Sequence, residues 1–417
     1  MSVTGSRAPA PTATADPERW PDVGRPARAP FRAWVVRRLL AGAARRTGIR
    51  VEWPDGRVTG RPGGPVLRIL DESAFFDRIG RHGQIGFGEG YMAEDWDSPD
   101  LAALLEPMAR HLRYLVPRRL QWIRRFYEPG PPADHGNDRA GARRNISRHY
   151  DLSNDLFTLF LDETMTYSSA LFETPGESLE GAQVRKIDSL LDMARVGQGS
   201  TVLEIGTGWG ELALRAARRG AEVTSLTLSE EQARLARQRV AQAGLERSVK
   251  VVVQDYRDST GTYDAVVSVE MIEAVGERWW PTYFETLEER LAPGGRIALQ
   301  AILMDHDEMI AARRAWTWIH KYIFPGGMIP SLESIETTLT NRSELRILQR
   351  RHFGPSYAET LKQWRARFDQ RWPDVAALGF DHTFRRMWDY YLAYSEAGFR
   401  SGRLDVAQLA IGRDGGL

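Results

Sequence analysis

A carboxylate followed by alternating glycines stands at residues 203–210, which read LEIGTGWG. Glu204 lies two positions before Gly206, and Gly208 and Gly210 follow at the same interval. Glycine directly after a strand lets the backbone pass close to a ligand, with φ values that other residues avoid. In an open parallel sheet, ligands bind beyond the carboxyl ends of the strands. The stretch therefore predicts a strand, a closely approaching loop and a ligand beside it.

The charge near these glycines indicates which kind of ligand fits. The dinucleotide fingerprint is G-x-G-x-x-G, and its pyrophosphate lies at a helix N-terminus that attracts anions. Here the spacing is G-x-G-x-G, and Glu204 and Glu211 bring negative charge to that terminus. A cationic ligand with an amine and no phosphate fits better, and S-adenosylmethionine is such a ligand. A tight turn from strand to helix, without a ligand, is the alternative interpretation.

Polar residues follow the next two predicted strands. The second strand runs into TLSEEQ, where Thr227 and Gln232 can hydrogen-bond ribose hydroxyls and Ser229 suits the N-cap of a helix. After the third strand, Asp255 is placed to accept a hydrogen bond from an adenine amine, and the ring of Tyr256 can lie on the adenine face. An aspartate that caps a turn is the alternative for Asp255.

Strands and helices alternate through this part of the chain. Apolar runs at 200–206 and 221–229 indicate buried strands, and the patterns between and after them indicate helices. This alternation predicts an α/β fold, a doubly wound parallel sheet. We divide the chain into a disordered tail over 1–30, a smaller α+β N-terminal domain over 31–128, a linker over 129–142 and the parallel-sheet domain over 143–417.

The N-terminal domain is expected to begin with a basic helix over 31–51. The region from 50 to 100 is expected to mix short strands and turns, with an Asp-Gly hairpin in RVEWPDGRV. Aromatic and aliphatic residues beside arginine suit an anionic membrane surface. Packing on the domain itself, with the arginines reaching out to solvent, is the alternative. The residues concerned in the helix are Trp34, Arg37, Arg38, Arg45 and Arg46.

The composition narrows the class of protein. The 417 residues have a formal net charge of +1, which gives no overall attraction for nucleic acid. There is no cysteine, so disulfides, zinc–thiolate sites and thiol nucleophiles are excluded. No apolar run approaches the roughly 18 residues of a spanning helix, and the N-terminal segment lacks the apolar core of a secretory signal. We therefore expect a cytoplasmic protein that contacts a membrane from the surface.

Segments in order along the chain resemble the cyclopropane fatty acid synthases and, more broadly, the methyltransferases that modify double bonds in lipid acyl chains. The resemblance implies a class I methyltransferase domain with an acyl-binding helical insert, and S-adenosylmethionine as cofactor. It implies phospholipid acyl chains at the inner membrane face as partners, and it leaves a homodimer open. The matching segments include VLEIGTGWGELA, EMIEAVG at 270–276, KYIFPGGMIPS at 321–331 and YYLAYSEAGFR at 390–400.

The resemblance also implies how the cofactor is held. Gly206 and Gly208 would line its amino-acid moiety, near the carboxylate of Glu204, and Thr227 and Gln232 would bind its ribose. The segments HYD and TYS would enclose it through Tyr150, Tyr167 and Ser168.

A second site implied by the resemblance holds a bicarbonate ion that acts as base. Its residues correspond to Ser169, Glu273, Gln300, the backbone of Ile302, and Tyr357. Typical members have cysteine in place of Ser169 and histidine in place of Gln300. Serine and glutamine can both still donate a hydrogen bond to an anion. The anion site is therefore expected, with two departures in its ligands.

Methyl transfer to an alkene leaves a carbocation on the neighbouring carbon, which aromatic faces stabilise and a base must quench. Loss of a proton from the new methyl closes a cyclopropane, whereas loss from a chain carbon gives a methyl-branched chain. Aromatic residues at 316–324 are expected to line the acyl site. A methyltransferase for nitrogen or oxygen of a small soluble acceptor, and a membrane-binding protein without catalysis, are the alternatives.

Overall fold

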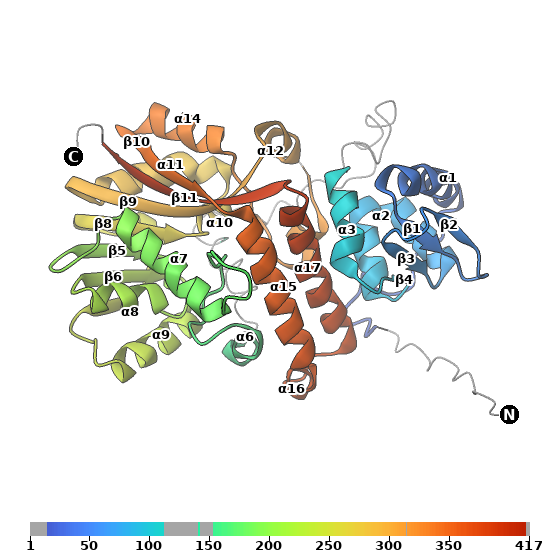
Figure 1. The fold of residues 1–417 in the computed structure, drawn as a ribbon, viewed down its shortest axis with the longest axis horizontal. Coiled ribbons are helices and arrows are strands. Elements are labelled where there is room, and N and C mark those ends of the chain that lie inside the picture. The colour runs from blue at the N-terminus through green and yellow to red at the C-terminus, as the bar shows by residue number, and fades with distance from the viewer. Residues whose placement is uncertain (1–14, 112–140, 142–152, 314, 414–417) are drawn as a thin grey trace. The chain divides into compact units, whose positions relative to one another are not determined.

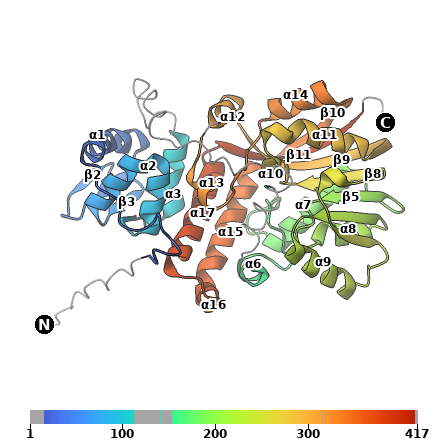
Figure 2. The same ribbon diagram turned by 180° about the vertical axis from the view of Figure 1, so that it is seen from behind.

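The computed structural model describes residues 15–111, 141, 153–313 and 315–413 (Figures 1 and 2). The chain divides into two compact units. The first comprises residues 1–128 together with 379–394, and the second comprises 129–378 together with 395–417. The sequence interpretation placed 379–394 with the parallel-sheet domain, whereas these residues belong to the first unit. That segment is the first part of a helix, α17 (His382–Arg400).

The first unit contains a small mixed sheet and the helices that cover it. The strand order is β2-β1-β3-β4, with β1 (Arg50–Glu52) and β3 (Val66–Ile69) parallel. The expected hairpin is confirmed, because β1 pairs antiparallel with β2 (Val58–Gly60). The remaining elements are α1 (Pro30–Thr47), α2 (Glu72–Met92), β4 (Trp96–Asp97) and α3 (Leu101–Arg110).

Two expectations for this unit differ from the structure. Residues 72–92 form a long helix, α2, instead of strands and turns, and it is kinked at Gly83. Its glycines allow close approach, since a Cβ on Gly86 would lie 2.3 Å from the carbonyl oxygen of Arg78. The second difference concerns the tail expected over 1–30, because part of it is bound to the domain. The buried Arg78 pairs with Asp95 at 2.8 Å and donates to the carbonyl of Val23 at 3.2 Å.

The second unit is built on a seven-stranded sheet of order β10-β11-β9-β8-β5-β6-β7. The five strands from β9 to β7 are parallel, as predicted for a doubly wound sheet, whereas β10 and β11 add an antiparallel edge. The strands are β5 (Thr201–Ile205), β6 (Glu222–Thr227), β7 (Val249–Val253), β8 (Tyr263–Val269), β9 (Leu291–Met304), β10 (Leu345–His352) and β11 (Leu404–Arg413).

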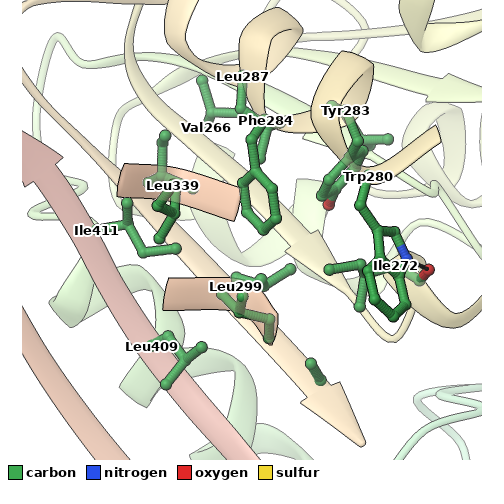
Figure 3. Close-up of a cluster of buried hydrophobic side chains, with 14 of the residues drawn as sticks. Val266, Ile272, Trp280, Tyr283, Phe284, Leu287, Leu299, Leu339, Leu409 and Ile411 are labelled. Carbon is green, nitrogen blue, oxygen red and sulfur yellow. Dashed lines mark hydrogen bonds between the residues drawn. The ribbon is translucent and has the colours of Figure 1, made fainter. Parts of the chain in front are cut away.

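Apolar clusters cover both faces of this sheet, which explains why β5 and β8 are almost continuously apolar. On one face, side chains from β8, β9 and β11 pack with the helices α11 (Trp280–Glu289) and α14 (Leu332–Arg342), as Figure 3 shows. On the other face lie α7 (Leu179–Met193), α8 (Glu211–Arg218) and α9 (Glu230–Gln242). The predicted N-cap at Ser229 is confirmed, because its side chain accepts from the backbone N–H of Gln232.

The short helix α10 (Ile272–Val275) follows β8, and α12 (His306–Ala312) and α13 (Trp318–Tyr322) follow β9. The helices α6 (Asn154–Phe160), α15 (Gly354–Gln370) and α16 (Trp372–Ala377) complete the unit. Among the described helices of the whole chain, none is both long and apolar enough to cross a bilayer.

Candidate active site

The glycines after β5 have the backbone that the sequence predicts. Gly206, Gly208 and Gly210 all have positive φ, between +51° and +98°. A Cβ on Gly206 would lie 2.7 Å from Cγ of Met271, whereas a Cβ on Gly208 would meet no atom within 4 Å. Gly206 is therefore needed for the close approach of two loops, while the position of Gly208 faces open space of the kind that a cofactor needs.

Glu204 lies on β5 just before these glycines and is almost fully buried. It accepts a hydrogen bond from the hydroxyl of Ser225 on β6. Burial raises the pKa of Glu204 to about 8, although the Ser225 hydrogen bond and the charge of Lys186 act in the opposite direction. A buried acid of this kind gains most from a cationic ligand, because a nearby positive charge favours its ionised form.

The residues expected at the ribose come together between β6 and α9. The Thr227 hydroxyl donates to Oε1 of Gln232 at 3.0 Å, and it accepts from the Ser229 N–H at 3.1 Å. Thr227 and Gln232 are both buried. Their contact with a ribose remains a prediction.

Asp255 is engaged by its own neighbour. Its carboxylate accepts from Nε of Arg257 at 2.8 Å and from a terminal guanidinium nitrogen at 2.6 Å. It also accepts from the Arg257 N–H at 3.0 Å, so the alternative of a turn-capping aspartate is confirmed. The Arg257 guanidinium lies over the rings of Tyr256 and Trp279. The adenine contacts expected of Asp255 and Tyr256 remain predictions.

The TYS segment packs around a buried lysine. Lys186 on α7 is 1% exposed, and its Nζ donates to Oγ of Ser168 at 2.7 Å. Burial lowers the pKa of Lys186 to about 8, while nearby carboxylates including Glu270 raise it. The ring of Tyr167 lies 5.2 Å from that of Trp364. The sequence analysis missed Lys186, although one signal was available, since the chain has only four lysines among 56 basic residues. Tyr150 lies outside the described residues.

Glu270, which follows β8, is the centre of the second part of the site. Its Oε1 accepts from the backbone N–H of Ser169 at 2.9 Å and from Nε2 of Gln300 at 2.8 Å. Its Oε2 accepts from the hydroxyl of Tyr357 at 2.7 Å. Gln408 on β11 orients the amide of Gln300, because its Nε2 donates to Oε1 of Gln300 at 3.2 Å. Burial raises the pKa of Glu270, and these hydrogen bonds and Lys186 oppose that rise.

Glu273 on α10 is the neighbouring carboxylate. Its Oε1 accepts from the backbone N–H of Ile302 at 2.5 Å, whereas its Oε2 is buried and has no hydrogen-bond partner among the described residues. Burial raises the pKa of Glu273 to about 8, and the negative charge of Glu270 raises it further. An unpartnered buried carboxylate oxygen with a raised pKa can act as a general base.

The structure thus brings together Ser169, Glu273, Gln300, Ile302 and Tyr357, which the resemblance placed around bicarbonate. The four donors among them, however, are already bound to carboxylates of the chain: Ser169, Gln300 and Tyr357 donate to Glu270, and Ile302 donates to Glu273. The Ser169 donor is its N–H, because its hydroxyl donates to the carbonyl of Ala170. These residues therefore do not fit a separate bicarbonate. The sequence analysis missed Glu270, whose signal was a second glutamate in EMIEAVG.

The segment expected to line the acyl site, residues 316–324, comes just before residues that contact Glu273. Trp316 stacks on His320 and Trp318 packs against Tyr322, with ring centroids 5.7 Å and 5.2 Å apart. Just beyond this segment, the N–H of Met328 donates to the backbone carbonyl of Glu273 at 2.8 Å. Contact of residues 316–324 with an acyl chain remains a prediction.

The cofactor position can be tested with Gly208→Asn. Asparagine tolerates the left-handed backbone, and the added side chain would enter the open space beside Gly208 (φ +51°). We expect affinity for S-adenosylmethionine in calorimetry to fall by about tenfold or more, roughly 1.4 kcal/mol, with an unchanged melting temperature. The matched control is Gly244→Asn, which also has positive φ (+66°) and open surroundings, at the end of α9. Equal losses in both variants would contradict the placement.

Comparisons with known proteins agree with this geometry. Residues 137–409 match the family model of mycolic acid cyclopropane synthetases. The chain is 53% identical to tuberculostearic acid methyltransferase of Mycobacterium tuberculosis over 97% of this chain and 98% of that one. It is 33% identical to cyclopropane-fatty-acyl-phospholipid synthase of Escherichia coli, over 81% and 86% of the two chains.

Among solved structures, it resembles a mycolic acid cyclopropane synthase complexed with SAH and CTAB, with a TM-score of 0.60 and 31% identity over 64% of this chain and 97% of that one. The parallel sheet of the second unit is thus that of a class I methyltransferase fold, and the placement of the cofactor beside Glu204 and the glycines after β5 remains a prediction. The chain belongs to the mycolic acid cyclopropane synthetase family, and it is an S-adenosylmethionine-dependent lipid methyltransferase.

Proposed function

We propose that this enzyme methylates a double-bond carbon of an unsaturated fatty acyl chain carried by a phospholipid, and that it works from the cytoplasmic face of the membrane. The names of two relatives support this proposal, one a tuberculostearic acid methyltransferase and one a cyclopropane-fatty-acyl-phospholipid synthase. The observation that carries it is the carboxylate pair Glu270 and Glu273 after β8, one member of which has a free buried oxygen.

When bound, S-adenosylmethionine supplies a sulfonium methyl group that an alkene carbon can attack, which leaves a carbocation on the neighbouring carbon. Glu204 and the loop at Gly206 and Gly208 would hold its amino-acid end. Transfer to nitrogen or oxygen needs only a polar acceptor held close to the methyl group. Transfer to carbon also needs a base shielded from water, and the free oxygen of Glu273 meets that need.

The carboxylate pair has two effects on such a carbocation. Its negative charge, in surroundings of low dielectric, stabilises the developing positive charge. Oε2 of Glu273 then accepts the proton. Loss of the proton from the transferred methyl closes a cyclopropane. If a hydride first shifts from the methylated carbon to the carbocation, loss of a methyl proton gives a methylene branch, whereas loss from a chain carbon gives a methyl-branched alkene.

The test of this function is incubation of the purified protein with S-adenosylmethionine and vesicles of monounsaturated phospholipid. Mass spectrometry should show a gain of one CH₂ unit on the acyl chain, and proton NMR should distinguish cyclopropane signals from those of a methylene group. Cofactor binding without any CH₂ gain would overturn the proposal and favour a soluble acceptor.

Glu273→Gln should lower turnover about 10²- to 10⁴-fold, because general-base assistance is typically worth that much. Cofactor affinity should stay close to that of the parent.

In the parent, kcat/KM should rise with pH through about 8, since the base must lose its proton and burial holds the pKa of Glu273 near that value. Initial methylation rates from pH 6 to 9 measure both effects. Glu285→Gln is the control, since it makes the same exchange at an exposed position. Parental turnover in Glu273→Gln would argue against this base.

Ser169→Ala should have little effect, because the donor to Glu270 is the backbone N–H, which alanine keeps. Tyr357→Phe removes a side-chain donor to the same carboxylate. Hydrogen bonds to charged groups are worth about 1.5–3 kcal/mol, so its turnover should fall roughly 10- to 150-fold. Initial rates on the same vesicles compare the two variants. A larger loss in Ser169→Ala than in Tyr357→Phe would contradict this assignment.

For the membrane contact, we propose the exposed side of α1. One side of α1 packs on α2, where the backbone N of Ala33 lies close to Gly80. On the exposed side, Phe31 is 72% and Trp34 is 54% exposed, and the Arg38 guanidinium lies over the Trp34 ring. Two exposed aromatic rings beside arginine suit an anionic lipid interface.

Replacing Phe31 and Trp34 with serine should therefore reduce sedimentation with anionic vesicles. Raising the salt concentration should weaken binding of the parent, because exposed charges are screened. Cofactor affinity should not change. The control is Leu348→Ser, which removes another exposed apolar side chain, from β10. Equal sedimentation of the double variant and the parent would refute the contact.

A further inference from the structure

We propose that Glu270 supplies, from within the chain, the negative charge that a bound bicarbonate would otherwise provide, so that this enzyme turns over without bicarbonate. The inference rests on the proposed function above and concerns the same site. The donors expected to bind bicarbonate are bound to the Glu270 carboxylate in the structure.

The donors converge on Glu270 from three separate parts of the second unit. Ser169 precedes α7, Gln300 belongs to β9 and Tyr357 belongs to α15. All three donate to the Glu270 carboxylate at 2.7–2.9 Å, which is the normal range for such bonds. The fourth expected donor, the N–H of Ile302, binds Glu273. A carboxylate has the same planar pair of oxygens that bicarbonate offers, so one can replace the other on these donors.

The backbone of Glu270 supports a functional role. Its φ is +51°, in the left-handed region that non-glycine residues seldom occupy. Such residues persist where surrounding contacts hold them, and they gather at functional sites. Here the Glu270 N–H donates to the carbonyl of Gln300 at 2.8 Å, and the side chain makes the three bonds described above. Glycine would adopt this backbone without strain, whereas glutamate is strained there. The advantage of glutamate at position 270 is therefore its carboxylate.

The surroundings of the two glutamates give them different roles, with Glu270 as the negative charge and Glu273 as the base. Burial raises the pKa of Glu270, while its three hydrogen bonds and the buried Lys186 act against that rise by favouring the ionised form. Glu273 has no donor to its Oε2, and the charge of Glu270 makes it more basic. In the quenching step, a C–H bond of the transferred methyl breaks and its electron pair forms the third C–C bond of the ring. If a hydride has first shifted from the methylated carbon to the carbocation, the same electron pair forms the double bond of a methylene branch. The proton moves to Oε2 of Glu273, which becomes neutral and later releases it to water.

The experiment is chemical rescue of Glu270→Gly. This variant removes the carboxylate and leaves a residue suited to φ +51°. In bicarbonate-free buffer, its turnover should fall about 10²- to 10⁴-fold, comparable with the loss of general-base assistance, while its melting temperature should equal or exceed that of the parent. Millimolar formate or bicarbonate should then raise the turnover of Glu270→Gly at least tenfold. The parent should be indifferent to both anions.

Two variants control for other causes. Glu270→Gln removes the charge but still fills the space, so it should be inactive and not rescued. Arg195→Gly replaces an exposed residue that also has positive φ (+58°), and it should behave like the parent. Full activity of Glu270→Gly without added anion, or equal rescue of Glu270→Gln, would overturn the proposal.

A binding measurement separates this inference from the proposed function. ¹³C-bicarbonate observed by NMR should bind to Glu270→Gly and not to the parent, whatever the lipid substrate proves to be. Bicarbonate binding by the parent, or loss of parental activity when bicarbonate is removed, would overturn the role of Glu270. Absence of methylation on every monounsaturated phospholipid would instead overturn the proposed function, and the binding result would still stand.

Discussion

A negative charge shielded from water must be matched by donors and counter-charges, and this requirement organises the second unit. The Glu270 carboxylate takes an N–H from the segment before α7, an amide from β9 and a hydroxyl from α15. Charge-assisted hydrogen bonds of this kind are stronger than neutral ones, and they lose most if one partner is removed. The network therefore ties the sheet to the C-terminal helix α15 and fixes the place where chemistry can occur.

The topology of the sheet brings this network next to the glycine loop after β5. Because β5, β6, β8 and β9 are parallel, their carboxyl ends lie at the same edge, and a ligand at that edge contacts loops from several strands. Glu204 belongs to β5, and Glu270 directly follows β8 beside it. The antiparallel strand β11 adds Gln408, which holds Gln300 in the orientation that Glu270 needs. The edge of the sheet that departs from the parallel pattern is thus part of the site.

Much of this arrangement could be predicted from the sequence, because the local sequence patterns favour the same backbone conformations that the tertiary structure requires. The alternating strands and helices, the positive φ of Gly206 and Gly208 and the cap at Ser229 all follow from short patterns. The expected anion residues also come together, since each follows or lies near the end of a strand or helix of the resembling segments. Glu273 was assigned correctly to this cluster, although its role as base is still a prediction.

The remainder depended on contacts that no local pattern encodes. The partner of Ser169 is 101 positions away and uses the backbone N–H, so the side-chain substitution from cysteine gave no information about it. Asp255 is paired with an arginine two residues later, and composition cannot show whether such a neighbour turns toward it or away. The helix α2 was mistaken for strands because its glycines suggested turns, whereas they serve close approach within a kinked helix.

The charges of the site also explain why a cationic cofactor belongs there. Glu204 and Glu270 lie near the buried Lys186, Glu273 lies near Glu270, and burial raises the pKa of all three acids. Without further positive charge, Glu204 and Glu273 hold their protons near neutral pH because their pKa values lie at about 8. S-adenosylmethionine carries a sulfonium, an ammonium and a carboxylate group, so it adds one net positive charge, which lowers those pKa values and favours release of protons. Binding of such a cofactor would therefore ionise the base at the moment when the methyl donor is in place, and its conversion to an uncharged thioether would favour return of the proton.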